Sequence, residues 1–425
     1  TKDKGCMAER AEIPMIQKIS RIFTPVCFYA LMSFWVALPF SKALMEIAFG
    51  VALTAWVLRF ARRSQEQTDR PPAFLLFLLT GYTILSVLSV FWSEFRAVSV
   101  RGIFKVLEQV LVCAMTFDLL QEPKRFRRFY KIFAVAFAVI LADAVWQYVW
   151  GWDFIRFFKA QEADAGRRVV GSFYSYGLLA AYLLMTIPMA FSAVWGRSAE
   201  FFSKKVRWGY WGLVLLGGMV LYWTRSRGAF ASLGLGVLIF LAGIRRWKWL
   251  IAFGIFGLLF VIFAPPNMII HRNIEAKEQS VVERYYLWDR AIQVIRAKPW
   301  TGTGINTYAK AHQKYDKTQN WRVRDYYAHN GYLQMAAETG IPSVVFFLAF
   351  LGVLLVHILK TAQAADPADR GLLWGFAVSI LNFMIFGAVD TVFHNPQSIL
   401  MFWFVLGTAG ALSVHSRASI FPKGT

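Results

Sequence analysis

Long apolar runs separated by short polar loops dominate the pattern of this sequence. A run that crosses the roughly 30 Å hydrocarbon core of a membrane needs about 20 residues, because a helix rises about 1.5 Å per residue. We find twelve such runs, at about 22–40, 43–60, 73–92, 98–120, 129–149, 172–195, 208–224, 228–244, 249–265, 341–359, 371–389 and 398–416. The pattern predicts an all-α, polytopic membrane protein with about 12 transmembrane helices.

The fourth run differs from the others because it contains charged side chains. Arg101, Lys105 and Glu108 all lie within it. Charged groups inside a membrane helix face protein or water rather than lipid. We therefore expect this face of the helix to turn towards the interior of the bundle or towards water.

Basic residues in the short loops predict the orientation, since Lys and Arg are retained on the cytoplasmic side. With the N-terminus inside, every even-numbered connection is basic, whereas most of the others are poorer in Lys and Arg. Both termini are then cytoplasmic and the long connection faces outwards. The predicted parts are transmembrane helices one to nine (1–265), the large outer loop (266–340), and helices ten to twelve with a cytoplasmic tail (341–425).

Composition agrees with this class and narrows the chemistry. The chain is 57% hydrophobic, and its net charge of +21 is mostly accounted for by loops beside anionic lipid, so the charge does not argue for nucleic acid. Cys6, Cys27 and Cys113 fall at the cytoplasmic end or inside spans, so we expect no disulfide framework. The sequence has no Walker loop, paired-carboxylate metal motif or zinc-type His/Cys spacing, and predicts no metal and no cofactor.

In this topology the unusual polar residues gather on the outer side of the membrane. Each has an ordinary structural explanation when taken alone: an interfacial anchor, a loop salt bridge or a helix end. Four arginines and a histidine together, without a metal motif, favour a binding site for a phosphorylated substrate. The residues are Arg168, Arg225, Arg227, Arg284, His329, Asp390 and His394.

The outer loop contains two predicted helices. Ser280 and Glu283 have the spacing of a capping box, and the helix that they open should end near Ala297. A second helix is predicted over 328–339, with His329 in its first turn and a stop at Gly340.

Four segments resemble the successive motifs of the O-antigen ligase and polymerase superfamily. The residues YSYG at 174–177 differ from the family's usual motif, which commonly has an asparagine-proline pair at this place. The histidine-headed motif that follows the long outer loop is the most specific. The segments are RVVGSF (168–173), TRSRGA (224–229), ERYYLWDRAIQVIRAKPWTGTGINTY (283–308) and HNGYLQMAAETGIP (329–342).

The resemblance implies a GT-C-like glycosyltransferase of the bacterial inner membrane, with its active site facing the periplasm. The donor would be a glycan on undecaprenyl pyrophosphate. His329 would be the general base that activates an acceptor hydroxyl. Arg225 and Arg227 would hold the donor pyrophosphate, Arg168 and Arg284 would bind phosphate or glycan, and Asp390 would orient His329.

The leading function is an O-antigen ligase that joins O-polysaccharide to lipid A–core oligosaccharide without a metal. Two alternatives use other acceptors: an O-antigen polymerase and a protein O-oligosaccharyltransferase. A third alternative, from a different class, is a flippase or transporter of the lipid-linked glycan. Its polar residues should line a path at the bilayer midplane instead of gathering outside.

Overall fold

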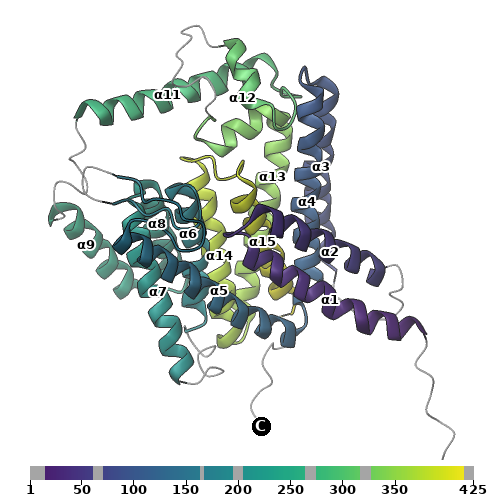
Figure 1. Cartoon of the computed structure of the whole chain (residues 1–425), viewed down its shortest axis with the longest axis vertical. Coiled ribbons are helices and arrows are strands. Elements are labelled where there is room, and N and C mark those ends of the chain that lie inside the picture. The colour runs from purple at the N-terminus through teal and green to yellow at the C-terminus, as the bar shows by residue number, and fades with distance from the viewer. Residues whose placement is uncertain are drawn as a thin grey trace, which may run out of the picture. The chain divides into compact units, whose positions relative to one another are not determined.

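The computed structural model describes residues 15–60, 70–162, 167–194, 204–263, 274–315 and 327–415. These residues form helices joined by turns, with two isolated β-bridges, so the all-α prediction is confirmed for them (Figure 1). Residues 1–14 and 416–425, and with them Cys6, lie outside the described residues. The elements are α1 (Met15–Ala37), α2 (Lys42–Phe60), α3 (Ala73–Leu88), η1 (Ser89–Trp92), α4 (Arg96–Leu120), α5 (Pro123–Trp150), α6 (Tyr176–Ser192), α7 (Lys204–Thr224), α8 (Arg227–Gly243), α9 (Trp247–Phe263), α11 (Ile274–Ala297), α12 (Tyr308–Ala311), η3 (His312–Tyr315), α13 (Gly331–Ala364), α14 (Pro367–Gly387) and α15 (Pro396–His415).

Several helices have the length and composition of membrane spans, and the chain is a polytopic membrane protein. Each of the twelve predicted runs overlaps a helix of the described chain. The count of twelve crossings and the orientation remain predictions. The helices long and apolar enough to cross a membrane are Ala73–Trp92, Pro123–Trp150, Gly331–Ala364, Asp369–Gly387 and Pro396–Val414, and shorter apolar helices are Ile22–Ala37, Tyr176–Ser192 and Arg227–Gly243.

The chain divides into two compact units, Thr1–Thr68 and Asp69–Thr425. In the first, α1 and α2 form a helical hairpin in which the Cys27 thiol donates a hydrogen bond to the Ala52 carbonyl oxygen, at 3.3 Å. Cys27 and Cys113 are both buried, and neither forms a disulfide bond.

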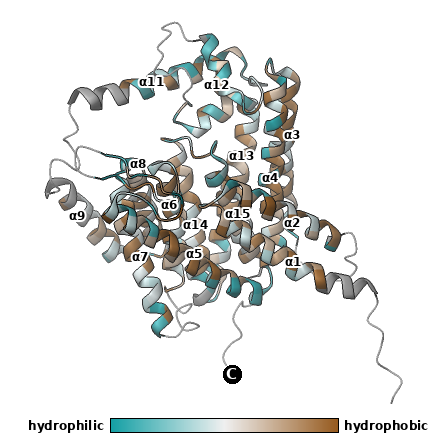
Figure 2. Ribbon diagram, viewed as in Figure 1, coloured by the Kyte–Doolittle hydropathy of each residue, from teal (hydrophilic) through white to brown (hydrophobic). Residues whose placement is uncertain are grey.

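The centre of the second unit is formed by α14 and α15, which are almost completely buried. Helix α14 packs against α6, α8 and α13, while α15 packs against α4. Helices α14 and α15 also pack against each other through aromatic rings: the Phe383 and Phe402 rings stack with centroids 4.5 Å apart. Figure 2 shows apolar ribbon in most helices of this unit, with more hydrophilic ribbon in α11 and α12.

The two predicted helices of the outer loop exist, but their bounds differ from the prediction. Helix α11 ends at Ala297 as predicted, yet it begins at Ile274, so the capping-box interpretation of Ser280 was wrong. The segment before Ser280 is rich in Glu, Ala, Lys and Gln, which are strong helix formers, and the helix therefore starts earlier.

Helix α13 begins later than predicted and includes both the second outer-loop helix and the tenth predicted run. Asn330 is its N-cap, and the Asn330 side chain accepts hydrogen bonds from the backbone N–H groups of Tyr332 and Leu333, both at 3.1 Å. His329 therefore lies before the helix, not in its first turn. The predicted stop at Gly340 is confirmed: its φ of +82° and ψ of 161° are not helical, and a second helical stretch, which corresponds to the predicted tenth run, follows to Ala364.

Candidate active site

His329 sits at the entrance to α13 with a backbone conformation unusual for a residue with a side chain. Its φ is +48°, in the left-handed region. The side chain is half-buried, and this burial lowers the pKa of the imidazole below its ordinary value. The Asp390 charge acts in the opposite direction and raises the His329 pKa, whereas the Arg284 charge lowers it. The neutral form of His329 is thus favoured, and the ring lies within electrostatic reach of Asp390, its predicted partner, and of Arg284.

Asp390 lies in the turn between α14 and α15, close to the start of α6. Its Oδ1 accepts a hydrogen bond from the Thr391 backbone N–H at 2.7 Å. Its Oδ2 approaches Gly177 so closely that a Cβ added there would lie 3.0 Å away. The absence of a side chain at Gly177 therefore leaves room for the carboxylate between α6 and the His329 region.

Two of the predicted arginines are brought together by backbone contacts, although 57 positions separate them in the sequence. The Val169 N–H donates to the Trp223 carbonyl oxygen at 3.1 Å, which holds the 167–170 segment against the end of α7. Arg168 Nη2 then donates to the Arg225 carbonyl oxygen at 3.5 Å. The Arg168 guanidinium also lies 4.0 Å from the centroid of the Tyr176 ring, a cation–π contact that orients it.

Arg227 joins the same region as the first residue of α8. The N-cap of this helix is Ser226, whose hydroxyl accepts a hydrogen bond from the Ala229 N–H at 3.4 Å. The next residue, Gly228, lies so close to Val389 that a Cβ at Gly228 would be 2.9 Å from Val389 Cγ2. The start of α8 is therefore adjacent to the turn that carries Asp390.

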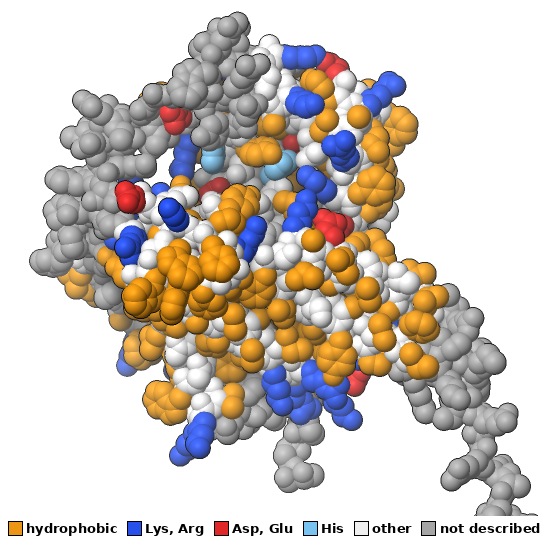
Figure 3. All heavy atoms as spheres, in the orientation of Figure 1, with side chains coloured by type: hydrophobic (Ala, Val, Ile, Leu, Met, Phe, Trp, Pro, Cys, Tyr) orange, Lys and Arg blue, Asp and Glu red, His pale blue; other side chains and the backbone are white. Residues whose placement is uncertain are grey.

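Taken together, these contacts join two groups that the sequence analysis proposed. Arg168, Arg225 and Arg227 lie at the junction of α6, α7 and α8, while His329 interacts electrostatically with Asp390 and Arg284. Gly177 and Gly228 connect the groups because both contact the α14–α15 turn. In Figure 3, histidine side chains lie in a hollowed part of the surface with Lys and Arg side chains around it.

Glu338 is a buried residue of this region that the sequence analysis missed. Its side chain is on α13 with only 7% of the residue exposed. Oε2 accepts a hydrogen bond from the Asn306 backbone N–H at 2.9 Å, and Oε1 accepts one from the Tyr308 N–H at 3.1 Å. A lone carboxylate in an otherwise apolar helical stretch was the signal that could have revealed it. Glu338 fixes the loop before α12 to the helix that follows His329.

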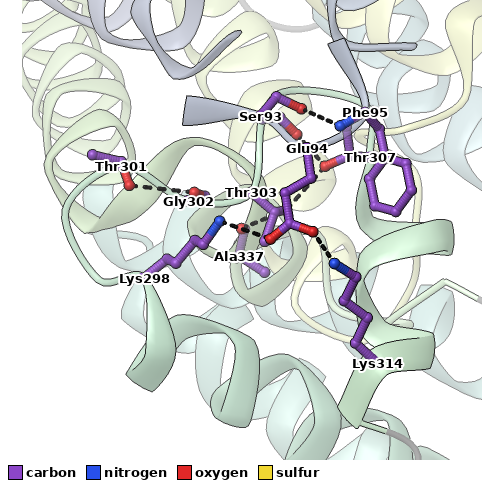
Figure 4. A network of polar contacts seen from close by, with 11 residues as sticks. Ser93, Glu94, Phe95, Lys298, Thr301, Gly302, Thr303, Thr307, Lys314 and Ala337 are labelled. Atoms are coloured by element: carbon purple, nitrogen blue, oxygen red, sulfur yellow. Dashed lines mark hydrogen bonds and ion pairs between the residues drawn. The ribbon is translucent and has the colours of Figure 1, made fainter. Parts of the chain in front are cut away.

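A second polar network fixes the same loop from its other side (Figure 4). The Glu94 carboxylate lies between the ammonium groups of Lys298, at 3.3 Å, and Lys314. Deeper in the protein, Thr303 Oγ1 donates to the Ala337 carbonyl oxygen at 3.2 Å. These contacts tie the end of α11 and η3 to the segment that follows η1 and to α13.

The inward face expected for the charged fourth run is confirmed at Lys105. Its Nζ donates a hydrogen bond to Asn306 Oδ1 at 2.9 Å. Among the residues that the structure describes, no group of three or more His, Cys, Asp or Glu side chains is placed to hold a metal ion.

Comparison with known proteins bears on this geometry. Residues 212–348 match the protein-family model described as O-antigen ligase. These residues are therefore similar to an O-antigen ligase domain. The resemblance stated from the sequence motifs is confirmed in this form, and proteins of this family are enzymes that transfer glycans. The O-antigen ligase domain includes Arg225, Arg227, Arg284 and His329, whereas Arg168 and Asp390 lie outside the matched residues.

A curated relative extends the similarity beyond the O-antigen ligase domain. The exopolysaccharide production protein ExoQ of Rhizobium meliloti (strain 1021) is 23% identical over 364 residues. The alignment covers 79% of this chain and 77% of ExoQ.

Proposed function

We propose that the protein transfers a preassembled glycan from undecaprenyl pyrophosphate to an acceptor hydroxyl at the periplasmic face of the inner membrane. One observation carries this proposal. A half-buried histidine with a lowered pKa lies within electrostatic reach of an aspartate, and the turn that holds this aspartate also contacts the arginine-bearing helix junction. That arrangement supplies a base for the acceptor and positive charge for the leaving group.

The arginines would bind the donor pyrophosphate. A guanidinium presents a planar fork of N–H donors that matches phosphate oxygens, and its charge persists at physiological pH. Arg225 and Arg227 are assigned to the pyrophosphate, and Arg168 and Arg284 to phosphate or to the first sugars. As the bond to the sugar breaks, negative charge grows on the pyrophosphate, and fixed guanidinium groups stabilise that charge without a metal.

His329 would act as the general base. Its neutral ring takes the proton of the acceptor hydroxyl while the oxygen attacks the anomeric carbon of the donor sugar. The bond from that carbon to the pyrophosphate oxygen breaks, and undecaprenyl pyrophosphate leaves with the electron pair. The Asp390 carboxylate then stabilises the imidazolium that has formed.

The leading acceptor is lipid A–core oligosaccharide, which makes the protein an O-antigen ligase. A polymerase is the second candidate, and similarity to ExoQ, an exopolysaccharide production protein, favours it, because exopolysaccharide production requires chain growth. A protein O-oligosaccharyltransferase would use the same site with a protein hydroxyl. A flippase or transporter is less well supported, since the proposed residues other than Arg284, which lies within α11, are at helix ends and in turns instead of along a path through the bundle.

The test is transfer by purified full-length protein from undecaprenyl-pyrophosphate glycan to each acceptor class offered separately. His329→Ala should lower turnover about 10²- to 10⁴-fold, the usual contribution of a general base, and leave donor binding near normal. His357→Ala, within α13, is the matched control and should retain wild-type turnover. Wild-type turnover by a folded His329→Ala protein would refute the assignment of the base.

A further inference from the structure

A cavity lies beside the segment that follows His329, and none of the proposed arginines lines it. It begins at Gly331, two residues after His329, and continues along α13 as far as Phe347. Helix α4, the 305–306 loop and the start of α15 form its other walls, and about 80 Å³ of it is open to water-sized molecules. Its lining residues include none of the six side chains assigned to the base and the pyrophosphate. The cavity therefore has room for a ligand other than the donor pyrophosphate.

The polar side chains of this cavity have a defined orientation. Gln334 Nε2 lies 3.0 Å from His394 Nδ1 and donates to Glu338 Oε1 at 3.4 Å, so the amide nitrogen of Gln334 faces both groups. His394 Nδ1 then accepts a hydrogen bond, which puts the ring proton on Nε2. Burial lowers the pKa of His394 to about 3, with Lys105 acting in the same direction, so the ring is neutral at physiological pH.

This orientation leaves the carbonyl oxygen of the Gln334 side chain without a partner. Gln334 is 97% buried, being only 3% exposed, and its Oε1 has no hydrogen-bond partner among the described residues. A buried acceptor of this kind is costly unless a donor reaches it. Since the atom belongs to a residue that lines the cavity, the missing donor is best supplied by a ligand there.

The remaining walls indicate the chemistry of that ligand. Aromatic rings of Tyr82, Phe347 and Phe393 line the cavity, beside the carboxylates of Glu108 and Glu338. These two carboxylates outnumber the one basic side chain of the lining, Lys105, and so disfavour an anion such as pyrophosphate. Apolar walls with a few placed hydrogen-bonding groups are typical of sites for small uncharged ligands. A sugar ring has hydroxyl groups that donate to Gln334 Oε1 and apolar faces that pack against aromatic rings.

We propose that this cavity binds the acceptor sugar whose hydroxyl attacks the donor. The inference rests on the proposed function, because transfer between two glycans requires two binding sites flanking one base. The arginine junction serves the donor, and the cavity opening at Gly331 presents the acceptor hydroxyl next to His329. Gln334 Oε1 accepts a hydrogen bond from another hydroxyl of the same sugar and so selects its orientation.

Two-substrate kinetics with the full-length protein in detergent test this assignment. The probes are free core oligosaccharide and, in a separate arm, a single repeat unit of the donor glycan, which distinguish ligase from polymerase acceptors. Gln334→Leu keeps the approximate size of the side chain and removes its acceptor. It should raise the KM for one of these acceptors about tenfold and leave the donor KM unchanged, because one buried hydrogen bond to substrate is lost. Gln313→Leu on η3 is the matched control and should leave both KM values unchanged.

Equilibrium binding in the inactive His329→Ala background separates this inference from the proposed function. Titration calorimetry should show acceptor binding that Gln334→Leu weakens. If Gln334→Leu fails to fold, Gln109→Leu in the same cavity is the second variant, and it should also weaken acceptor binding. If the wild-type protein transfers glycan, but Gln334→Leu and Gln109→Leu leave the acceptor KM and acceptor binding unchanged, the acceptor site alone is overturned. Wild-type protein that transfers glycan to no acceptor would instead overturn the proposed function.

Discussion

Replacing Glu338 by glutamine tests how the loop before α12 is held against the helix that follows His329. The two carboxylate oxygens accept hydrogen bonds from the backbone N–H groups of Asn306 and Tyr308, at 2.9 and 3.1 Å. A glutamine supplies one acceptor oxygen, so its NH₂ group must face one of these N–H donors. A buried donor left unsatisfied costs about 1–3 kcal/mol, and weakening of the remaining bond adds to this. We expect local opening of the loop to become easier by about 2 kcal/mol, which corresponds to roughly thirtyfold faster amide exchange.

Hydrogen exchange read by mass spectrometry on peptides covering 302–311 measures this effect in the intact protein. Glu94→Gln is the matched control, because Glu94 contacts Lys298 and Lys314 of the same region but is half exposed. Exposed ion pairs contribute about 0–1 kcal/mol, so its exchange should rise less than about fivefold. Equal exchange in Glu338→Gln and the wild type would show that the buried carboxylate does not hold the loop.

Four further outcomes follow from the proposed site and the predicted topology. Because the Asp390 charge raises the His329 pKa, Asp390→Asn should lower that pKa, and the acid limb of the kcat/KM profile should move to lower pH; a shift to higher pH would contradict the geometry. Arg225→Lys should weaken donor binding measured by titration, since a point charge only partly replaces a bidentate fork. Because arginines and not a metal are proposed to hold the pyrophosphate, transfer by the wild type should survive excess EDTA. A single cysteine at Lys314 should react with a maleimide confined to the periplasm and one at Arg125 should not; the reverse would invert the topology.

The element types could be predicted from the sequence because apolar runs of membrane length leave little choice of backbone structure. The residues at which the helices near the motifs begin could not be predicted from the sequence. Asn330 caps α13 through a local hydrogen bond, and this displaces His329 from the helix that the residue pattern assigned to it. The helix break predicted at Gly340 is present, but the contact made there, from the Ile341 N–H to the Pro299 carbonyl oxygen at 2.8 Å, could not be predicted from the sequence.

The site was predictable in residue types and less so in contacts. Arginines and a histidine were identifiable because charge is costly near hydrocarbon and indicates function there. The partners of Glu338 and Gln334 were not identifiable, since Asn306, Tyr308 and His394 lie 30 or more positions away and meet these side chains only after the helices pack. Hydrophobic periodicity predicts which face of a helix is buried, but it does not predict which loop packs against that face.

The packing of α14 explains why segments so distant in the sequence converge on one site. This helix contacts α6, α8 and α13 at once, and its C-terminal turn carries Val389 and Asp390. Val389 contacts the start of α8 beside Arg227, while the Asp390 carboxylate approaches Gly177 on α6 and acts on His329. A displacement of this turn would therefore alter the base and the proposed pyrophosphate site together. In the proposed mechanism, the position of α14 would therefore determine whether proton removal from the acceptor coincides with charge stabilisation on the donor.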